Sequence, residues 1–259
     1  MQFGVCGSPT AGACAALADY NYFEWSVGAL LKPRESEGAF LAALEESHAA
    51  GLPCPVVNNF VPGDLRITGP AVDFAALQNY VTTAFERAER AGIEVIVFGS
   101  GAARKIPEGF DDREAHDQLV RFCSMIAPIA AFHGVIVVLE PLNRQDCNVL
   151  NTVGECAALV REVAHPGLSL LVDAYHLLID DDSCADIVAN GDLLRHVHIA
   201  TIPHRLAPAA EPCDFSQFFD ALDRAGYNGR ISIEGNIPCP EAELPPALTL
   251  MRSLAKSGV

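Results

Sequence analysis

The strongest constraint on the fold is an apolar run that leads directly into a carboxylate. The stretch Val135–Leu139 contains only valine, isoleucine and leucine, and Glu140 follows it at once. An uninterrupted β-branched run is typical of a parallel strand that is buried on both faces. A carboxylate after its last residue would lie at the carboxyl end of the strand, where α/β barrels hold their catalytic groups.

Three later stretches repeat this arrangement. They are Leu168–Leu178 with Asp173 and His176, Arg195–Ala200 with His196 and His198, and Arg230–Asn236 with Glu234. A buried charge without a partner is costly, so two glutamates, an aspartate and a histidine at neighbouring strand ends need a shared positive partner. We therefore expect a divalent metal ion among them.

The composition limits the class of protein. The chain has 259 residues, half of them hydrophobic, which suits one sizeable core and the usual length of a single barrel. Its net charge of −16 and the lack of any run of basic residues argue against nucleic acid and anionic membranes as partners. No apolar run approaches the length of a membrane span, and the N-terminal residues do not have a secretory pattern.

The cysteines indicate a reducing compartment. There are nine, an odd number, and they are spread without any CxxC pair. We expect free thiols and a cytoplasmic location. Cys123 and Cys156 stand in apolar helical contexts, where a cysteine is typically a small core residue.

The order of elements predicts one α/β domain, a single (β/α)8 TIM barrel over residues 1–259. Besides the four stretches above, we expect strands at Gln2–Cys6, Tyr20–Trp25, Pro55–Phe60 and Glu94–Gly99. Helices are expected at about 10–18, 36–50, 72–91, 112–132, 152–163, 180–189, 214–225 and 240–256. This alternation is typical of βα units. A doubly wound open sheet is the competing fold, and the absence of GxGxxG after the first strand disfavours it.

Several motifs then carry a family resemblance. They are LEPLNR with Glu140, VDAYH with Asp173 and His176, HVHIA with His198 and with Arg205 beyond it, and ISIEGN with Glu234. In this order they resemble the xylose-isomerase-like family of sugar isomerases and epimerases, above all its ketose 3-epimerases and hydroxypyruvate isomerases. The stretches NNFVPGD and VFGSGAARKIPEGF extend the resemblance, which runs over the whole predicted barrel.

The resemblance implies a set of site residues. It places one metal ion on Glu140, Asp173, His198 and Glu234, and substrate contacts on Asp146, His176 and Arg205. Asp146 departs from the family pattern, because the epimerases have a glutamate there and the side chain is one methylene shorter here. His196 has no ligand role in this pattern, so we expect it to be structural or to support the ligands.

The implied chemistry is proton transfer next to a carbonyl through a metal-bound enediolate. A Lewis acid is needed because such a proton is too weakly acidic for a carboxylate alone. Oxygen ligands with one imidazole favour Mn²⁺, with Mg²⁺ or Co²⁺ as alternatives. Glu140 and Glu234 are the expected catalytic pair, one on each face of the substrate carbon.

The sequence leaves the substrate open. Ketose 3-epimerisation is the favoured reaction, and hydroxypyruvate isomerase-like aldose–ketose isomerisation is the alternative. The substrate is a small sugar or hydroxy-keto acid, and Arg104, Lys105, Arg144 and Arg205 are the candidates for a phosphate contact. The sequence also leaves open whether the chain forms a homo-oligomer.

Other functions and plainer roles compete with this prediction. Metal-dependent endonucleases for abasic DNA use the same barrel, but they need further histidines where this chain has Asn58, Asn59, Gly99 and Ser100. A non-catalytic sugar-binding barrel would have no need for four ligands. Glu140 and Glu234 could instead pair with Arg144 and Arg230, and Trp25 and Phe60 could either wall a pocket or pack in the core.

Overall fold

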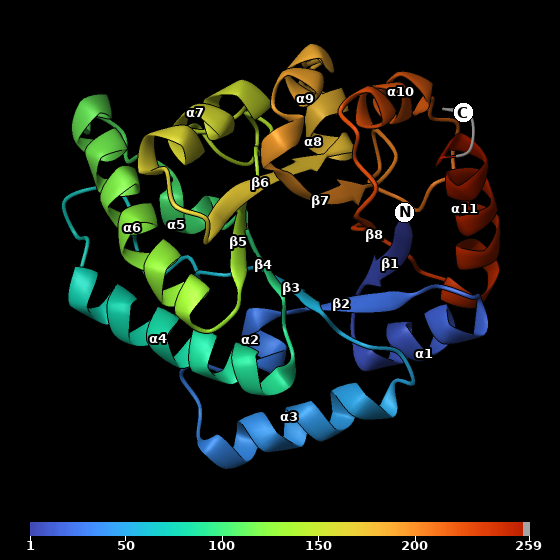
Figure 1. Cartoon of the computed structure of the whole chain (residues 1–259), viewed down its shortest axis with the longest axis horizontal. Helices are drawn as coiled ribbons and strands as arrows, with labels where there is room; N and C mark the ends of the chain where they lie inside the picture. The colour runs from blue at the N-terminus through green and yellow to red at the C-terminus, as the bar shows by residue number, and fades with distance from the viewer. Residues whose placement is uncertain (256–259) are drawn as a thin grey trace.

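The strands form a closed parallel barrel in the order β1 to β8, which confirms the predicted (β/α)8 TIM barrel (Figure 1). The structure is a computed structural model, and it describes residues 1–255. The strands are β1 (Gln2–Cys6), β2 (Tyr22–Ser26), β3 (Val56–Asn58), β4 (Val95–Phe98), β5 (Ile136–Leu139), β6 (Leu168–Asp173), β7 (Leu194–Ile199) and β8 (Arg230–Ile233).

Helices surround the barrel on its outside (Figure 1). They are α1 (Pro9–Leu17), α2 (Val27–Leu30), α3 (Glu37–Ala49), α4 (Phe74–Ala91), α5 (Gly101–Arg104), α6 (Asp112–Phe132), α7 (Val153–Val163), α8 (Ala174–Ile179), α9 (Ala185–Ala189), α10 (Ser216–Arg224) and α11 (Pro240–Ala255), with a short 3-10 turn η1 (Gly191–Leu193). None of the described helices is both long enough and apolar enough to cross a membrane.

Local sequence signals explain where the long helices begin and end. Asp73 accepts hydrogen bonds from the first turn of α4, and Gly92 ends that helix in the left-handed conformation at φ 70°. Thr152 and Glu155 form a reciprocal capping box at the start of α7. These caps match the predicted helix ends.

The expectation of eight helical segments was wrong in detail. The loops after β2, β4 and β6 contain the short helices α2, α5 and α8, whose four to six residues are too few for a visible apolar period. The helix expected at 180–189 begins only at Ala185, and the predicted end of the last helix at Lys256 lies outside the described residues.

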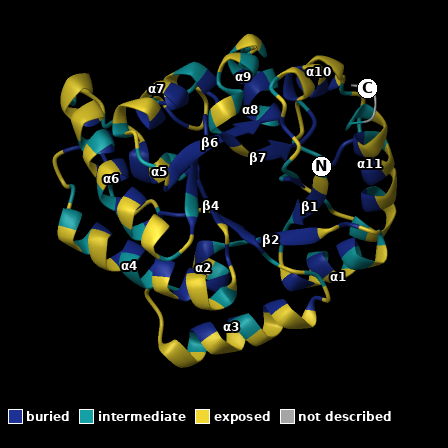
Figure 2. Ribbon diagram, viewed as in Figure 1, coloured by how far each residue is buried: buried dark blue, intermediate teal, exposed yellow. Residues whose placement is uncertain are grey.

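The inside of the barrel has two different halves. An apolar cluster fills one half and consists of Tyr22, Val56, Val95, Val97, Val138 and Leu171. The other half holds Glu24, His196, His198 and Ser232, all with 0% exposure. Figure 2 shows the strands largely buried and most exposed residues on the outer helices and loops. Among the strand residues, Gln2 of β1 and Arg195 of β7 are exposed.

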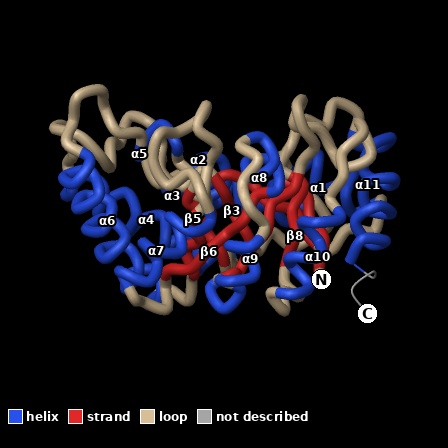
Figure 3. The backbone as a smooth tube through the Cα atoms, turned by 90° about the horizontal axis from the view of Figure 1, so that it is seen from above, coloured by secondary structure: helices blue, strands red, loops and turns tan. Residues whose placement is uncertain are grey.

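Strand register brings the predicted ligands together. In the parallel pairing, Asp173 of β6 lies opposite His198 of β7, and His198 lies opposite Ser232 of β8. Glu234 follows β8 two residues after Ser232. The longer loops gather on one side of the barrel, opposite the N-terminus, and these carboxyl ends open beneath them (Figure 3).

Candidate active site

The four predicted ligands converge at the carboxyl ends of β5 to β8. Glu140, Asp173, His198 and Glu234 each offer one ligand atom, and all four atoms lie within 4.8 Å of one another. His198 Nδ1 lies 3.3 Å from Glu140 Oε1 and 3.4 Å from Glu234 Oε2. The structure thus brings together the residues that the sequence selected, while their role as ligands stays a prediction.

Three of these groups have polar atoms that no hydrogen bond satisfies. Glu140 Oε1, Asp173 Oδ2 and His198 Nδ1 are buried and have no hydrogen-bond partner. Buried polar atoms without partners are rare and costly in folded proteins. Two carboxylate oxygens and an imidazole nitrogen that face one another fit a divalent cation such as Mn²⁺ or Mg²⁺.

The acidic side chains of the site lie close together in a buried place, and this shifts their pKa values. Burial raises the pKa of Asp173, although His176 opposes the shift. Burial would also raise the pKa of Glu234, but the positive charges of His198 and Arg205 outweigh it and the pKa is lowered. Glu234 is therefore held as a carboxylate, and a cation in the site would relieve the repulsion among the acids.

Gly99 makes room for Glu140. It follows β4, next to the end of β5, and a Cβ atom built on it would lie 2.2 Å from Glu140 Oε2. Real Cβ atoms do not approach an oxygen so closely. The glycine at this position therefore allows the Glu140 carboxylate to lie against the β4 backbone.

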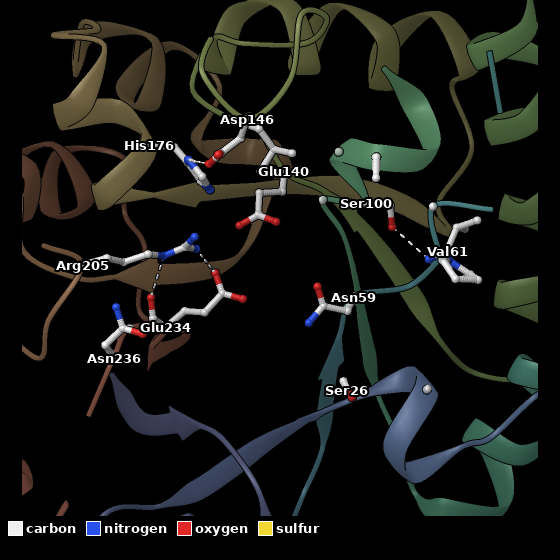
Figure 4. Close-up of a pocket in the computed structure, with 18 of the residues that line it drawn as sticks. Ser26, Asn59, Val61, Ser100, Glu140, Asp146, His176, Arg205, Glu234 and Asn236 are labelled. Atoms are coloured by element: carbon white, nitrogen blue, oxygen red, sulfur yellow. Dashed lines mark hydrogen bonds and ion pairs between the residues drawn. The ribbon is translucent and has the colours of Figure 1, made fainter. Parts of the chain in front are cut away.

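The predicted substrate contacts lie on the rim of the same site (Figure 4). Arg205 Nη2 lies 2.5 Å from Glu234 Oε2 and 3.6 Å from Asp173 Oδ2. His176, buried in α8, accepts a hydrogen bond at Nδ1 from the Asn143 amide at 2.8 Å. Asp146 is half-exposed and accepts a hydrogen bond from the same amide at 3.0 Å.

These residues form one wall of a pocket of about 720 Å³. The opposite wall is uncharged and includes Ser26, Gly28, Asn59, Val61, Gly63 and Ala102. Figure 4 shows Glu140, Glu234, Arg205 and His176 facing Asn59 and Ser26 across the open space. Among the described residues, Arg205 is the one arginine or lysine that lines this pocket.

The alternative ion pairs considered for the two glutamates are wrong. Arg144 pairs with Asp180 at 2.7 Å, and Arg230 pairs with Glu94 at 2.8 Å. Both arginines therefore form ion pairs with acids other than Glu140 and Glu234. Neither Glu140 nor Glu234 pairs with the arginine considered for it, and both line the pocket.

The predictions of aromatic pocket walls and of basic residues that contact a phosphate also need correction. Phe60 is fully buried and packs against Phe85 and Phe98, and Trp25 does not line the pocket. Arg104 is fully buried and donates to the main-chain carbonyls of Phe98, Glu140 and Leu150. Neither Lys105 nor Arg144 lines the pocket, so only Arg205 of the four basic candidates reaches it.

Sequence reasoning missed two buried side chains at this site. Asn58, at the end of β3, donates a hydrogen bond to Glu234 Oε1 at 3.0 Å. Glu24, in β2, accepts hydrogen bonds from His196 and His198 at 3.0 Å. The signal for Glu24 was a charged residue inside the aromatic strand YNYFEW, since a buried carboxylate needs a partner.

Comparison with known proteins gives a consistent relationship. The sequence model of the family described as xylose isomerase-like TIM barrel matches residues 13–255. An L-ribulose 3-epimerase from Methylomonas sp. is 30% identical over 238 residues, which cover 90% of this chain and 80% of that protein. A 3-dehydro-D-guloside 4-epimerase from Escherichia coli is 34% identical over 132 residues, covering 51% of this chain and 48% of that protein.

A further relative and a solved structure complete the comparison. A putative hydroxypyruvate isomerase from Xenopus laevis is 30% identical over 141 residues, which cover 51% of each protein. The crystal structure of a D-psicose 3-epimerase from Clostridium cellulolyticum, solved with D-tagatose, superposes with a TM-score of 0.85 at 19% identity. That superposition covers 98% of this chain and 99% of the other, and at this identity it supports the shared fold alone.

Proposed function

The chain belongs to the xylose isomerase-like TIM barrel family and is an isomerase, and we propose that it epimerises a neutral ketose with the help of one divalent metal ion. The observation that carries this proposal is the convergence of Glu140, Asp173, His198 and Glu234 on one point, with unsatisfied atoms facing inward. Two glutamates at such a point give both a metal site and a pair of proton carriers.

The metal site is proposed on these four residues, with Mn²⁺ the favoured ion. When bound, the ion would stabilise negative charge on the oxygens of the substrate, which makes the neighbouring carbon acidic enough to lose a proton. The single imidazole among oxygen ligands is what favours Mn²⁺ over Mg²⁺, with Co²⁺ as another candidate.

The proposed reaction moves one proton off a carbon and another onto it. One glutamate starts as a carboxylate and takes the proton, the C–H electron pair enters an enediolate, and the other glutamate, which starts protonated, delivers its proton to the opposite face, so the carbon inverts without oxidation. Glu140 follows β5 and Glu234 follows β8, and these strands stand three places apart in the closed barrel. Arg205 and Asn58 each bind one oxygen of Glu234, which holds this carboxylate in a fixed orientation.

We propose that Asp146, His176 and Arg205 bind the hydroxyl and carbonyl oxygens of the substrate. All three line the pocket beside the glutamates. The Nδ1 atom of His176 accepts from Asn143, which leaves the Nε2–H to donate. Arg205 would stabilise developing negative charge on a substrate oxygen.

The balance of charge supports a neutral substrate. With one glutamate protonated for the reaction, a divalent ion and Arg205 would balance the two remaining carboxylates among Glu140, Asp173 and Glu234 and leave a single positive charge. No further arginine or lysine of the described residues lines the pocket, and Asp146 adds a negative charge to the rim. A phosphate or a substrate carboxylate would therefore lack a partner, which favours a free ketose over a sugar phosphate.

Hydroxypyruvate isomerisation is the second candidate, supported by the similarity to the Xenopus laevis protein. It also passes through an enediolate but returns the proton to the neighbouring carbon, and it needs a cation for the substrate carboxylate. The pocket of about 720 Å³ is also large for a three-carbon acid, since volumes of roughly 300–1,000 Å³ hold drug-sized ligands.

The test is a metal-loaded activity screen in D₂O. Purified protein loaded with Mn²⁺ should interconvert C3-epimeric ketoses and place deuterium on the reacting carbon, whereas sugar phosphates and hydroxypyruvate should react at least about tenfold more slowly. Glu140→Gln and Glu234→Gln should each lose turnover, while His116→Gln on the surface helix α6 serves as the matched control. Full retention of the original hydrogen, or turnover in both glutamine variants with metal bound, would contradict the proton-transfer mechanism.

A further inference from the structure

We propose that Glu24 is a positioning residue that acts through His198 and sets how tightly the site binds its metal ion. The inference rests on the metal site of the proposed function and adds a residue on the far side of the histidine ring. Glu24 belongs to β2, across the barrel interior from β7, and does not line the substrate pocket.

The two nitrogens of His198 face different neighbours. Nδ1 points to the ligand atoms of Glu140 and Glu234, while Nε2 lies 3.0 Å from Glu24 Oε1 and 3.2 Å from Glu24 Oε2. As a metal ligand His198 is a neutral imidazole with one proton, and a carboxylate at Nε2 holds that proton there. Glu24 thereby leaves Nδ1 with a free lone pair directed at the ion, and it fixes the plane of the ring.

Glu24 is itself held in place by a buried network. Ser232 Oγ donates to Glu24 Oε2 at 2.7 Å, and Tyr22 Oη lies 2.9 Å from that serine oxygen. His196 Nε2 lies 3.0 Å from Glu24 Oε2. All these side chains have at most 1% exposure, so the carboxylate cannot turn away from His198 without losing several hydrogen bonds.

The network also separates the roles of the two histidines. His196 and His198 are two residues apart on β7 and point to the same face of the strand. Only His198 reaches the acids at the barrel mouth, whereas His196 Nδ1 is buried without a partner one step deeper. Glu24 hydrogen-bonds both rings and so connects the proposed metal ligand His198 to His196, which lies deeper in the barrel.

A second ion at Glu24 is the competing explanation. Cys6, Glu24 and His198 also bring potential ligand atoms within 4.8 Å of one another. Both oxygens of Glu24 and the Nε2 atom of His198 already take part in hydrogen bonds, and the Cys6 sulfur lies 3.9 Å from Nε2. These contacts satisfy the group without a cation, in contrast to the unsatisfied atoms at the barrel mouth.

The experiment is a Mn²⁺ titration of the whole 259-residue chain, monitored by calorimetry and by the electron paramagnetic resonance signal of free Mn²⁺. Wild type should bind one equivalent. Glu24→Gln keeps the shape but loses the charge, and it should weaken the affinity about 10- to 100-fold, the range seen when partners of metal ligands are changed. Tyr22→Phe is the matched control, since it deletes a hydrogen bond of the same network two contacts from His198 and should change the affinity less than twofold.

A double-mutant cycle tests whether the effect passes through the histidine. In the background of His198→Asn, Glu24→Gln should have no further effect on Mn²⁺ affinity. Equal losses with and without His198, or unchanged affinity in Glu24→Gln, would overturn the proposal, as would a second bound equivalent that disappears in Cys6→Ser.

One measurement needs no variant and covers the case in which Glu24→Gln does not fold. The side-chain ¹⁵N spectrum of Mg²⁺-loaded wild type should show His198 protonated at Nε2 and not at Nδ1, and the opposite tautomer would refute the proposal. Both readouts are independent of turnover. Failure of the epimerase assay with normal Mn²⁺ binding would therefore count against the proposed function and leave the role of Glu24 standing.

Discussion

Replacing Gly99 by alanine should disable the site without unfolding the protein. The added Cβ would lie 2.2 Å from Glu140 Oε2, whereas ordinary contacts begin at 3.4 Å, so the carboxylate must move by more than 1 Å. The obstructing atom is the end of a flexible side chain, and the next nearest atoms, Glu140 Cδ and Leu142 Cδ2, lie at 3.3 and 3.6 Å. The backbone can therefore stay in place while Glu140 turns.

The expected loss is large for catalysis and small for stability. A displacement of about 1 Å in a catalytic group costs roughly 10²-fold in rate, so kcat/KM for the best ketose should fall by about that factor. Mn²⁺ affinity should fall as well, because Glu140 is also a proposed ligand. Gly99 has no positive φ that alanine would strain, and the Tm without metal should stay within about 3 °C of wild type.

The assay combines turnover, Mn²⁺ titration and thermal unfolding on the same preparation. Gly38→Ala in the outer helix α3 is the matched control, since Gly38 does not line the pocket and the nearest atom to its added Cβ lies at 4.0 Å. It should keep turnover within about twofold of wild type. Normal activity and metal binding in Gly99→Ala would refute the reasoning, because Glu140 would then function from another position.

Three further predictions concern single side chains. Asp173→Asn should reduce bound Mn²⁺ from about one equivalent to well below half under the same loading, as measured by elemental analysis, because it removes a buried charged ligand; equal uptake would remove Asp173 from the site. Arg205→Ala should keep the metal stoichiometry but lower kcat/KM at least about tenfold in steady-state kinetics, and loss of metal instead would make Arg205 part of the scaffold. Arg104→Leu should lower the free energy of unfolding by about 3 kcal/mol or more in urea titrations, because it leaves buried carbonyls unpaired; a change below 1 kcal/mol would contradict that account.

Much of the fold could be predicted because its signals are local. The helix caps at Asp73 and Thr152 and the apolar run before Glu140 are readable from neighbouring residues alone. The alternation of these elements then specified the barrel, and the position of each acid at a strand end predicted which groups would meet. The short helices α2 and α8 were missed because a single turn shows no period.

The missing parts of the site depend on contacts across the barrel. The importance of Glu24 comes from His196 and His198, which are more than 170 positions away in sequence, and no local pattern links them. Arg104 looked like a phosphate contact because a charged residue in a loop is usually exposed, but here it lies fully buried beneath Glu140. Such partners are defined by the closure of the barrel and not by spacing along the chain.

The ion pair between Arg205 and Glu234 has a consequence for selectivity. Any sugar oxygen that approaches this guanidinium replaces or shares an existing partner, so binding is an exchange between two acceptors and its net free energy is small. All ketoses share the keto–hydroxyl group that would approach Arg205. Weak binding of this shared group gives little discrimination between ketoses on the Arg205 side of the pocket. Discrimination then depends on the uncharged wall around Ser26 and Asn59, whose shape and hydrogen-bonding groups decide which sugars fit. Under the proposed function we expect several related ketoses to be substrates, and changes in preference would arise on that wall while the acids stay the same.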